Sequence, residues 1–196
     1  YQTLILIPHL LSYVVVSYIA YAFLGAENGM INNQILRPLG LDPISFYTED
    51  KYWPFILVFV NIWKTFGYSS IIYFASIIGI DRTYYEAAEV DGASAWTQIW
   101  SITLPLLKPV LITMLLLSVG RILYSDFGLF YQVPMDSGML FNTTNTIDTF
   151  VYRGLLQTND LGRAAAANFI QSVMGFFLVL GANLIVRKVE KEYALF

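Results

Sequence analysis

Four long apolar runs constrain the folding of this chain more than any other feature. They cover residues 4–24, 53–74, 104–123 and 164–186. About 20 apolar residues in a helix cross the roughly 30 Å of hydrocarbon in a bilayer. Because the bilayer core offers no water to backbone groups, such runs must form helices there rather than open sheets or loops. The sequence therefore predicts an all-α, polytopic transmembrane helical bundle with four spanning helices.

The composition agrees with a membrane protein and argues against several other classes. Only 13% of the 196 residues are charged and 57% are hydrophobic, whereas soluble domains carry about 25% charged residues. The net charge of −3 gives no basic surface for nucleic acid, and the chain has no Cys and one His. It contains no Gly-rich nucleotide loop ending in Lys-Ser or Lys-Thr, no His/Cys metal cluster and no Ser-His-Asp set. We expect neither catalysis nor a metal or cofactor in this chain.

The segments between the apolar runs are rich in turn residues. We expect extramembrane loops at 25–52 and 124–163, with a short interfacial helix at 31–36 and helical spacing over 146–156. Asp148 and Arg153 in the second loop are interpreted as solvated charges. The chain begins with Tyr1 and without a signal-peptide pattern, so the numbering is expected to start inside a longer protein.

Two of the runs carry local features of interest. In the first, Pro8 is expected to be a first-turn proline or a mild kink in one continuous helix, and His9 an interfacial or bundle-facing residue. The last run opens with four alanines and carries Gly175 and Gly181. Small residues let helix backbones approach closely, so this helix is expected to pack inside the bundle.

Polar residues in or beside the runs are candidates for a translocation path. A charge inside a span costs about 3 kcal/mol on insertion scales, so Lys64 should face the bundle interior or a water-filled cavity. A stabilising role alone, by snorkelling or by pairing with a carboxylate, is an equal alternative. Arg121 and Asp126 flank the membrane boundary, where interfacial anchoring is equally compatible. The candidate path residues are Asn61, Lys64, Arg121, Tyr124 and Asp126.

The one long amphipathic stretch, residues 81–105, has a fixed internal plan. Thr83 and Glu86 form the pattern of a capping box at the start of a short helix. Asp91-Gly92 interrupts that helix, because Gly tolerates positive φ. A second short helix from Ala93 is expected to present an aromatic and apolar face.

The end of this stretch predicts the start of the third span. Thr103 can cap the next helix, with Pro105 in its first turn, where a missing N–H costs nothing. Read from the residues alone, the stretch is a capped helix-turn-helix on the surface between two spans.

The same stretch resembles the cytoplasmic coupling loop of bacterial ATP-binding-cassette importer permeases. The resemblance lies in Glu-Ala-Ala, three residues, Gly, nine residues and Ile-x-Leu-Pro. It implies that ATP and Mg²⁺ are bound and hydrolysed by a partner ATPase, against which this loop docks. The implied ATPase-coupling residues are Glu86, Ala87, Ala88, Asp91, Gly92, Ile102, Leu104 and Pro105.

Three further segments are similar to the carbohydrate branch of these permeases, in particular its complex-saccharide and polysaccharide members. They are Asn61-Ile62-Trp63-Lys64 with Gly67, residues 147–153, and Ala182-Asn183 with residues 186–188. Family members usually have six spans, so this chain is similar to the last four. The resemblance implies a sister permease subunit, two ATPase subunits, an extracellular solute-binding protein and an oligosaccharide or polysaccharide-fragment substrate.

The orientation in the membrane follows from the resemblance and not from the charges. With the coupling loop inside, five basic residues lie in or beside the inner segments (Arg82, Lys108, Arg187, Lys188 and Lys191), against four outside. That bias is too small to decide orientation alone. The resemblance places the chain in the bacterial cytoplasmic membrane as a multi-pass protein. An ion-coupled secondary transporter, a permease for a peptide or lipoprotein precursor, and a non-transporting scaffold are the alternatives.

Overall fold

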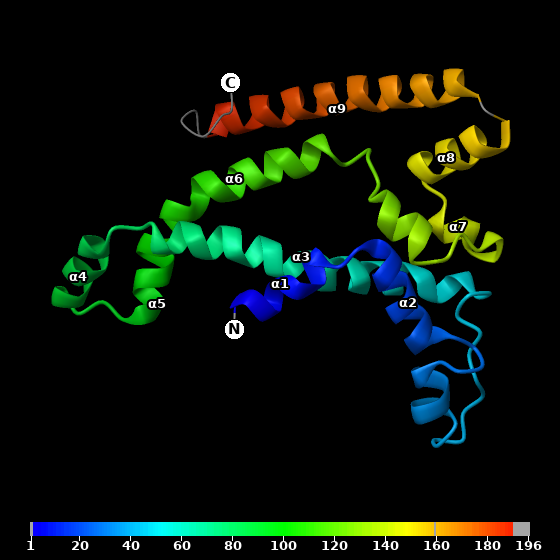
Figure 1. Cartoon of the computed structure of the whole chain (residues 1–196). Coiled ribbons are helices and arrows are strands. Elements are labelled where there is room, and N and C mark those ends of the chain that lie inside the picture. The colour runs from blue at the N-terminus through cyan, green and yellow to red at the C-terminus, as the bar shows by residue number, and fades with distance from the viewer. Residues whose placement is uncertain (1, 159, 190–196) are drawn as a thin grey trace. The chain divides into compact units, whose positions relative to one another are not determined.

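The fold is known from a computed structural model that describes residues 2–158 and 160–189, so Lys191 lies outside the described residues. Within this part every regular element is a helix and none is a strand (Figure 1), which confirms the all-α prediction. The α-helices are α1 (Gln2–Leu10), α2 (Tyr13–Leu24), α3 (Trp53–Ile78), α4 (Arg82–Val90), α5 (Ala95–Gln98), α6 (Leu104–Gly120), α7 (Phe141–Thr144), α8 (Ile147–Thr158) and α9 (Leu161–Val189). Short π or 3₁₀ turns are η1 (Ile31–Leu36), η2 (Asp50–Tyr52), η3 (Ile99–Thr103), η4 (Gly128–Gln132) and η5 (Gly138–Leu140).

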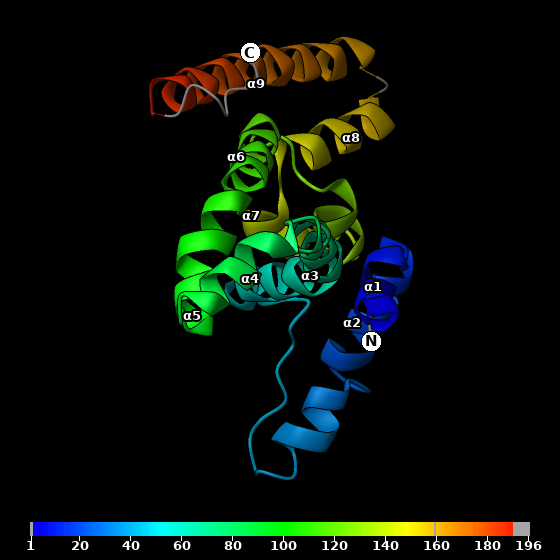
Figure 2. The same ribbon diagram turned by 90° about the vertical axis from the view of Figure 1, so that its left-hand side faces the viewer.

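Three helical stretches in the described residues are each long and apolar enough to cross a membrane. They are Asp50–Ile78, Ala95–Gly120 and Leu161–Lys188. The pair α1 and α2 becomes a fourth candidate only if the two helices are counted together. A short helix is present at 31–36 as η1, and its position at a membrane interface stays a prediction. The helical spacing over 146–156 corresponds to α8. Residues 37–49 between η1 and η2 form a long loop (Figure 2).

The first apolar run is not the continuous helix that we expected. It is divided into α1 and α2, which are bent by 96° relative to each other. Pro8 lies inside α1, which continues past it to Leu10, so the chain does not break at the proline. The break comes later, where the Ser12 hydroxyl accepts a hydrogen bond from the Val15 N–H and starts α2 as its N-cap.

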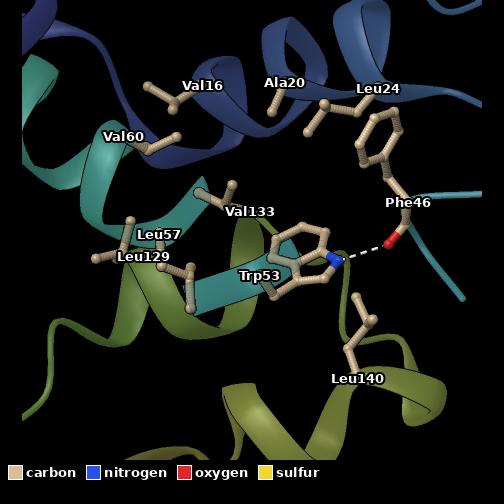
Figure 3. Packing of buried hydrophobic residues seen from close by; sticks show 10 residues of the cluster. All are labelled: Val16, Ala20, Leu24, Phe46, Trp53, Leu57, Val60, Leu129, Val133 and Leu140. Carbon is tan, nitrogen blue, oxygen red and sulfur yellow. Dashed lines mark hydrogen bonds between the residues drawn. The ribbon is translucent and has the colours of Figure 1, made fainter. Parts of the chain in front are cut away.

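The chain divides into two compact units, each described by itself. The first comprises the described residues of Tyr1–Gly67 and Tyr124–Phe169. Its core surrounds Trp53, which is fully buried and donates its indole N–H to the Phe46 carbonyl at 2.6 Å (Figure 3). The other members of this core are Val16, Ala20, Leu24, Phe46, Leu57, Val60, Leu129, Val133 and Leu140.

The second unit comprises residues 68–123 and the described residues from Ile170 onward. Within it α6 and α9 approach closely, since a Cβ on Gly175 would lie 3.3 Å from the Gly120 carbonyl oxygen. The Gln171 side chain donates to the Leu123 carbonyl at 2.8 Å, beyond the end of α6. Gly175 therefore takes part in the close approach that we expected of a small residue. Gly181 does not, because a Cβ at this position would have nothing within 4 Å.

Candidate functional site

The stretch 81–98 forms a helical hairpin of α4 and α5, called here the α4–α5 hairpin (Figure 1). None of the residues in α4, α5 or η3 is buried. Val90, Trp96 and Trp100 are among the most exposed large apolar side chains of the chain, at 89%, 71% and 66%. The hairpin thus offers an open, partly apolar surface within its unit.

The start of α4 differs from the expected capping box. The N-cap is Asp81, whose carboxylate accepts a hydrogen bond from the Thr83 N–H at 3.0 Å. This hydrogen bond is the main cause that holds the pKa of Asp81 below its ordinary value. Thr83 and Glu86 both lie within the helix, so Glu86 does not cap it and its side chain is exposed. An Asp before the Thr is an equally good N-cap, and the capping-box pattern predicted the wrong register.

The end of α4 confirms the expected interruption at Asp91-Gly92. Gly92 has φ +75°, and its N–H donates to the Glu89 carbonyl at 3.0 Å. The Ala93 N–H donates to the Ala88 carbonyl at 2.9 Å. These two bonds around a left-handed residue make a Schellman C-cap, which fixes the direction in which the chain leaves α4.

The hairpin joins α6 without a break. Ser94 caps α5, and the helical path then continues through η3 into α6, so that Ala95–Gly120 is one stretch of 26 residues. Thr103 lies inside this path and caps nothing with its side chain, contrary to our expectation. Its hydroxyl instead pairs with the Tyr85 hydroxyl at 2.9 Å and thereby connects α4 to η3. Pro105 lies in the first turn of α6, as predicted.

In the first unit, the structure brings together two of the five candidate path residues. Lys64 is buried on α3, and its ammonium donates to the carbonyls of Pro8, His9 and Leu11. It also lies 4.7 Å from the ring centroid of Tyr13, whose hydroxyl donates to Asp126 at 2.5 Å. Tyr13 therefore links Lys64 to Asp126. Sequence reasoning missed Tyr13, because one aromatic in an apolar run is indistinguishable from a lipid-facing one.

The remaining candidate path residues are exposed and belong to both units. Asn61 and Tyr124 belong to the first unit and are exposed. Arg121 belongs to the second unit, where it is the exposed C-cap residue of α6. Their assignment to a path stays a prediction.

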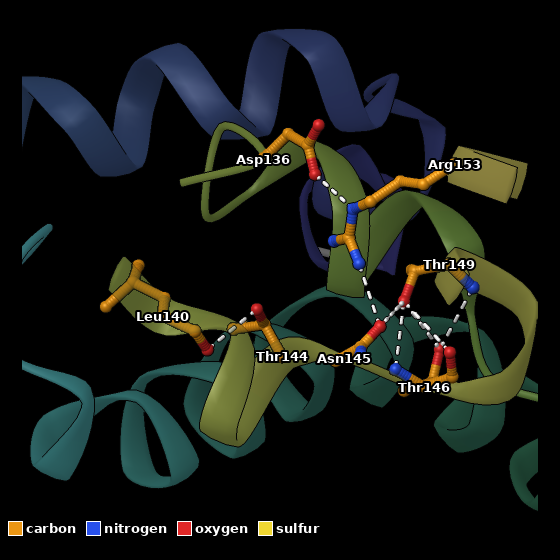
Figure 4. A network of polar contacts seen from close by, with 7 residues as sticks. All are labelled: Asp136, Leu140, Thr144, Asn145, Thr146, Thr149 and Arg153. Carbon is orange, nitrogen blue, oxygen red and sulfur yellow. Dashed lines mark hydrogen bonds and ion pairs between the residues drawn. The ribbon is translucent and has the colours of Figure 1, made fainter. Parts of the chain in front are cut away.

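A polar network joins the segments before and within α8 (Figure 4). The Arg153 side chain is only 11% exposed and forms an ion pair with Asp136 at 2.6 Å. It also donates to the Asn145 side chain at 2.8 Å and lies over the Phe141 ring. Figure 4 further shows Thr144, Thr146 and Thr149 in local hydrogen bonds.

This network corrects the interpretation of two charges as solvated. Arg153 is largely buried, and Asp148 accepts hydrogen bonds from both the backbone N–H and the hydroxyl of Ser125 at 2.6 Å. Asp136, the partner of Arg153, has φ +48°, which is uncommon for a residue other than Gly. These charges hold the loop segments against α8. Among the described residues, no group of three or more His, Cys, Asp or Glu side chains could hold a metal ion.

Comparison with known families decides what kind of protein this is. The family model "Binding-protein-dependent transport system inner membrane component" matches residues 1–191. The chain belongs to this family. Its members are membrane components of transport systems, and the described residues carry three or four apolar helical candidates for spans, which fits such a component.

Relatives within the family carry names from sugar and polysaccharide transport. The chain is 34% identical to the polygalacturonan/rhamnogalacturonan transport system permease protein YteP of Bacillus subtilis (strain 168), over 97% of this chain and 59% of that protein. It is 32% identical to the lactose transport system permease protein LacF of Rhizobium radiobacter, over 78% and 51%. This family member thus spans about three fifths or less of the length of these relatives.

A solved structure of a transporter has a similar fold. It is the crystal structure of a bacterial alginate ABC transporter in complex with an alginate pentasaccharide-bound periplasmic protein. One of its chains matches with a TM-score of 0.86 and 35% identity, over 97% of this chain and 65% of that one.

Proposed function

We propose that this chain is the translocation subunit of an ATP-driven, binding-protein-dependent importer of oligosaccharides or polysaccharide fragments. It works in the bacterial cytoplasmic membrane beside a sister permease and receives its substrate from an extracellular solute-binding protein. Its support is family membership together with the names of its relatives, which refer to the transport of polygalacturonan/rhamnogalacturonan, lactose and alginate.

The observation that carries the proposal is the direct connection between the α4–α5 hairpin and α6. The hairpin is exposed and its bend is fixed by the cap at Gly92. It continues as one helical stretch, Ala95–Gly120, into apolar sequence, and the Tyr85–Thr103 hydrogen bond connects α4 to that stretch. A partner ATPase that closes around ATP would push on the hairpin and so tilt α6.

The docking chemistry follows from the exposed residues. Glu86 and Ala87 are exposed on α4, and the small Ala87 side chain allows a partner groove to approach the helix backbone. Glu86 does not cap α4, so its carboxylate can form an ion pair with a basic residue of the ATPase. ATP and Mg²⁺ are held by that partner.

The substrate class rests on the relatives and is compatible with the exposed polar side chains. Asn61 and Tyr124 can serve as hydrogen-bonding and stacking partners for sugar hydroxyls and rings, and Arg121 as a partner for a carboxylate of an acidic saccharide. Lys64 is a weaker candidate for substrate contact than the sequence suggested, because its ammonium already donates to three carbonyls.

The left-handed backbone at Gly92 offers a sharp test. Gly92→Val forces a β-branched residue to φ +75°, at a strain of about 1–2 kcal/mol. We expect it to lower co-purification of the ATPase and uptake of a labelled oligosaccharide by roughly tenfold. Gly92→Asn is the matched control, because Asn tolerates this conformation, and it should retain both activities.

Two results would contradict the proposal. One is ATPase association that is equal in the Gly92→Val and Gly92→Asn variants while both insert normally into the membrane. The other is uptake that persists in cells lacking the ATPase, as expected of an ion-coupled carrier. A screen with acidic, neutral and peptide substrates separates a saccharide permease from the peptide and lipoprotein alternatives.

A further inference from the structure

The break after α1 leaves backbone carbonyls without hydrogen-bond donors from the helix itself. The last four carbonyls of any α-helix lack a helical N–H partner. In α1 the Ile7 carbonyl accepts from the Leu11 N–H at 3.3 Å. The carbonyls of Pro8 and His9 in its last turn, and that of Leu11 directly after it, accept from Lys64 on α3 instead. In an apolar run, each would cost several kcal/mol if no donor reached it.

Lys64 supplies donors to all three of these carbonyls. Its Nζ lies 3.3 Å from the Pro8 oxygen, 3.0 Å from the His9 oxygen and 2.5 Å from the Leu11 oxygen. An ammonium group has three N–H donors and no acceptor, so this arrangement can use its full capacity. A cation at the C-terminal end of a helix also interacts favourably with the helix dipole.

The charge of Lys64 is balanced by groups from two other segments. The Tyr13 ring, in the first turn of α2, faces the ammonium at 4.7 Å. The Tyr13 hydroxyl donates to Asp126, whose other carboxylate oxygen accepts from the Leu129 N–H at 3.3 Å. The Lys64 cation, the Tyr13 ring and the Asp126 carboxylate thus form a series of contacts from α3 through α2 to the segment before η4.

Two glycines provide the space for this series of contacts. A Cβ on Gly67, one turn after Lys64 on α3, would lie 2.0 Å from the Ile5 carbonyl oxygen of α1. A Cβ on Gly128 would lie 2.2 Å from the Tyr13 ring. Neither position can carry a larger residue unless backbone or ring moves. The close approach of α1 to α3 and the position of Tyr13 are therefore both built into the first unit.

We propose that the Lys64 ammonium is a tethered cation that occupies the break between α1 and α2 and holds the two helices at their bend. In transporters with broken membrane helices, the carbonyls freed at a break commonly coordinate a dissociable Na⁺. Here the ammonium of Lys64, which is covalently attached to α3, donates hydrogen bonds to these carbonyls in place of a dissociable ion. The bend is consequently independent of Na⁺ or K⁺ in solution, and the break offers no site for a coupling ion. This inference rests on the first unit alone and not on the proposed function.

The bend can be measured directly, because the chain has no native Cys. Leu4 on α1 and Tyr18 on α2 are 64% and 67% exposed and accept spin labels through Leu4→Cys and Tyr18→Cys. Their separation is measured by double electron–electron resonance on the full-length protein in lipid nanodiscs. From the 1.5 Å rise per residue, straightening the 96° bend would lengthen it by about 7 Å.

The first arm needs no change at Lys64. We expect one narrow distance distribution that is unchanged when NaCl or KCl is replaced by N-methylglucamine chloride. A distribution that shifts or narrows on addition of Na⁺ or K⁺ would mean that a dissociable ion occupies the break, and the proposal would be wrong.

The second arm removes the ammonium. Lys64→Met should broaden the distribution and move it toward the longer, straightened distance. Lys51→Met is the matched control, since Lys51 is an exposed lysine paired with Glu49 outside the break, and it should leave the distribution unchanged. If Lys64→Met gives the wild-type distribution, Lys64 does not hold the bend. Should this variant fail to insert, the ion-replacement arm still decides the proposal.

Discussion

Arg153 shows how a single charged side chain can organise a loop region in this chain. Its guanidinium connects Asp136 and Asn145 and lies over Phe141, with only 11% of the side chain exposed. Arg163 offers a natural comparison: it pairs with Asp160 at 2.9 Å, but its side chain is 81% exposed. Burial and not pairing distinguishes the two arginines.

That difference predicts opposite outcomes for the same substitution. Arg153→Met removes the donors from the partly buried Asp136 carboxylate and from the exposed Asn145 side chain, and it should lower the free energy of unfolding by about 1–3 kcal/mol. Arg163→Met should change it by less than about 0.5 kcal/mol, because exposed ion pairs contribute little. Chemical denaturation in mixed micelles measures both. Equal effects would show that the Arg153 network does not stabilise the fold.

Asp81 makes the start of α4 sensitive to acid. Its pKa is lowered in the folded state, chiefly by the hydrogen bond from the Thr83 N–H. A depressed carboxyl pKa contributes stability that is present above the unfolded value, 3.8, and is lost as the pH falls through the folded value. We expect amide hydrogen-exchange protection at Thr83 to fall several-fold between pH 6 and pH 3.

Asp81→Asn is the control for that measurement. Asn keeps the acceptor oxygen of a good N-cap and loses the titration. The protection of Thr83 should therefore stay constant over the same pH range in this variant. An equal loss of protection in both proteins would mean that another group controls the acid response.

For single residues, the sequence showed which side chains are unusual but not which groups they contact. Lys64 stood out because a lysine in an apolar run is costly, yet its carbonyl partners become visible only once α1 ends at a break. Asp148 and Arg153 looked like solvated charges because their partners are distant in sequence. Contacts between segments far apart in the chain leave no local pattern to read.

At the scale of elements, the contact between α6 and α9 depends on glycine. A Cβ on Gly120 would lie 2.9 Å from a Val179 methyl group, which is closer than real Cβ contacts. Gly120→Leu should therefore push the helices apart and lower the free energy of unfolding by about 1–3 kcal/mol. Gly181→Leu is the matched control on α9, where nothing lies within 4 Å, and should leave stability unchanged or slightly raised. Both are measured by thermal unfolding in detergent, and destabilisation by Gly181→Leu alone would contradict this assignment.

Helix type was more predictable than helix ends. Hydropathy located α3, α6 and α9, but α3 and α9 each extend several residues beyond the apolar runs. A helix can continue into more polar sequence, so a fall in hydropathy does not mark its end. The Asp91-Gly92 bend was predictable because its cause, a left-handed residue after a helix, is local. The break at Ser12 was not, since a Ser in an apolar run is compatible with an unbroken helix.

At the scale of the whole molecule, the three span candidates leave most of their apolar surface uncovered. Only 22%, 11% and 17% of their apolar windows are buried within the chain. Soluble proteins rarely expose such surface, so an apolar surrounding such as lipid must cover it. The chain spans about three fifths of its relative YteP, and a sister permease would add to that cover under the proposed function.

The charged residues of the span candidates predict the energy source for transport. The three span candidates contain Lys and Arg but no Asp or Glu after residue 53, whereas ion-coupled carriers place carboxylates at mid-membrane depth. The break between α1 and α2 is filled by Lys64. Under the proposed function, saccharide uptake by the transporter assembled in proteoliposomes should therefore require ATP on the side of the α4–α5 hairpin. Ionophores that collapse the Na⁺ and H⁺ gradients should leave its rate unchanged within error. A rate that falls with the ion gradient while ATP is constant would show that the chain moves its substrate by ion coupling, whatever the likeness of its fold.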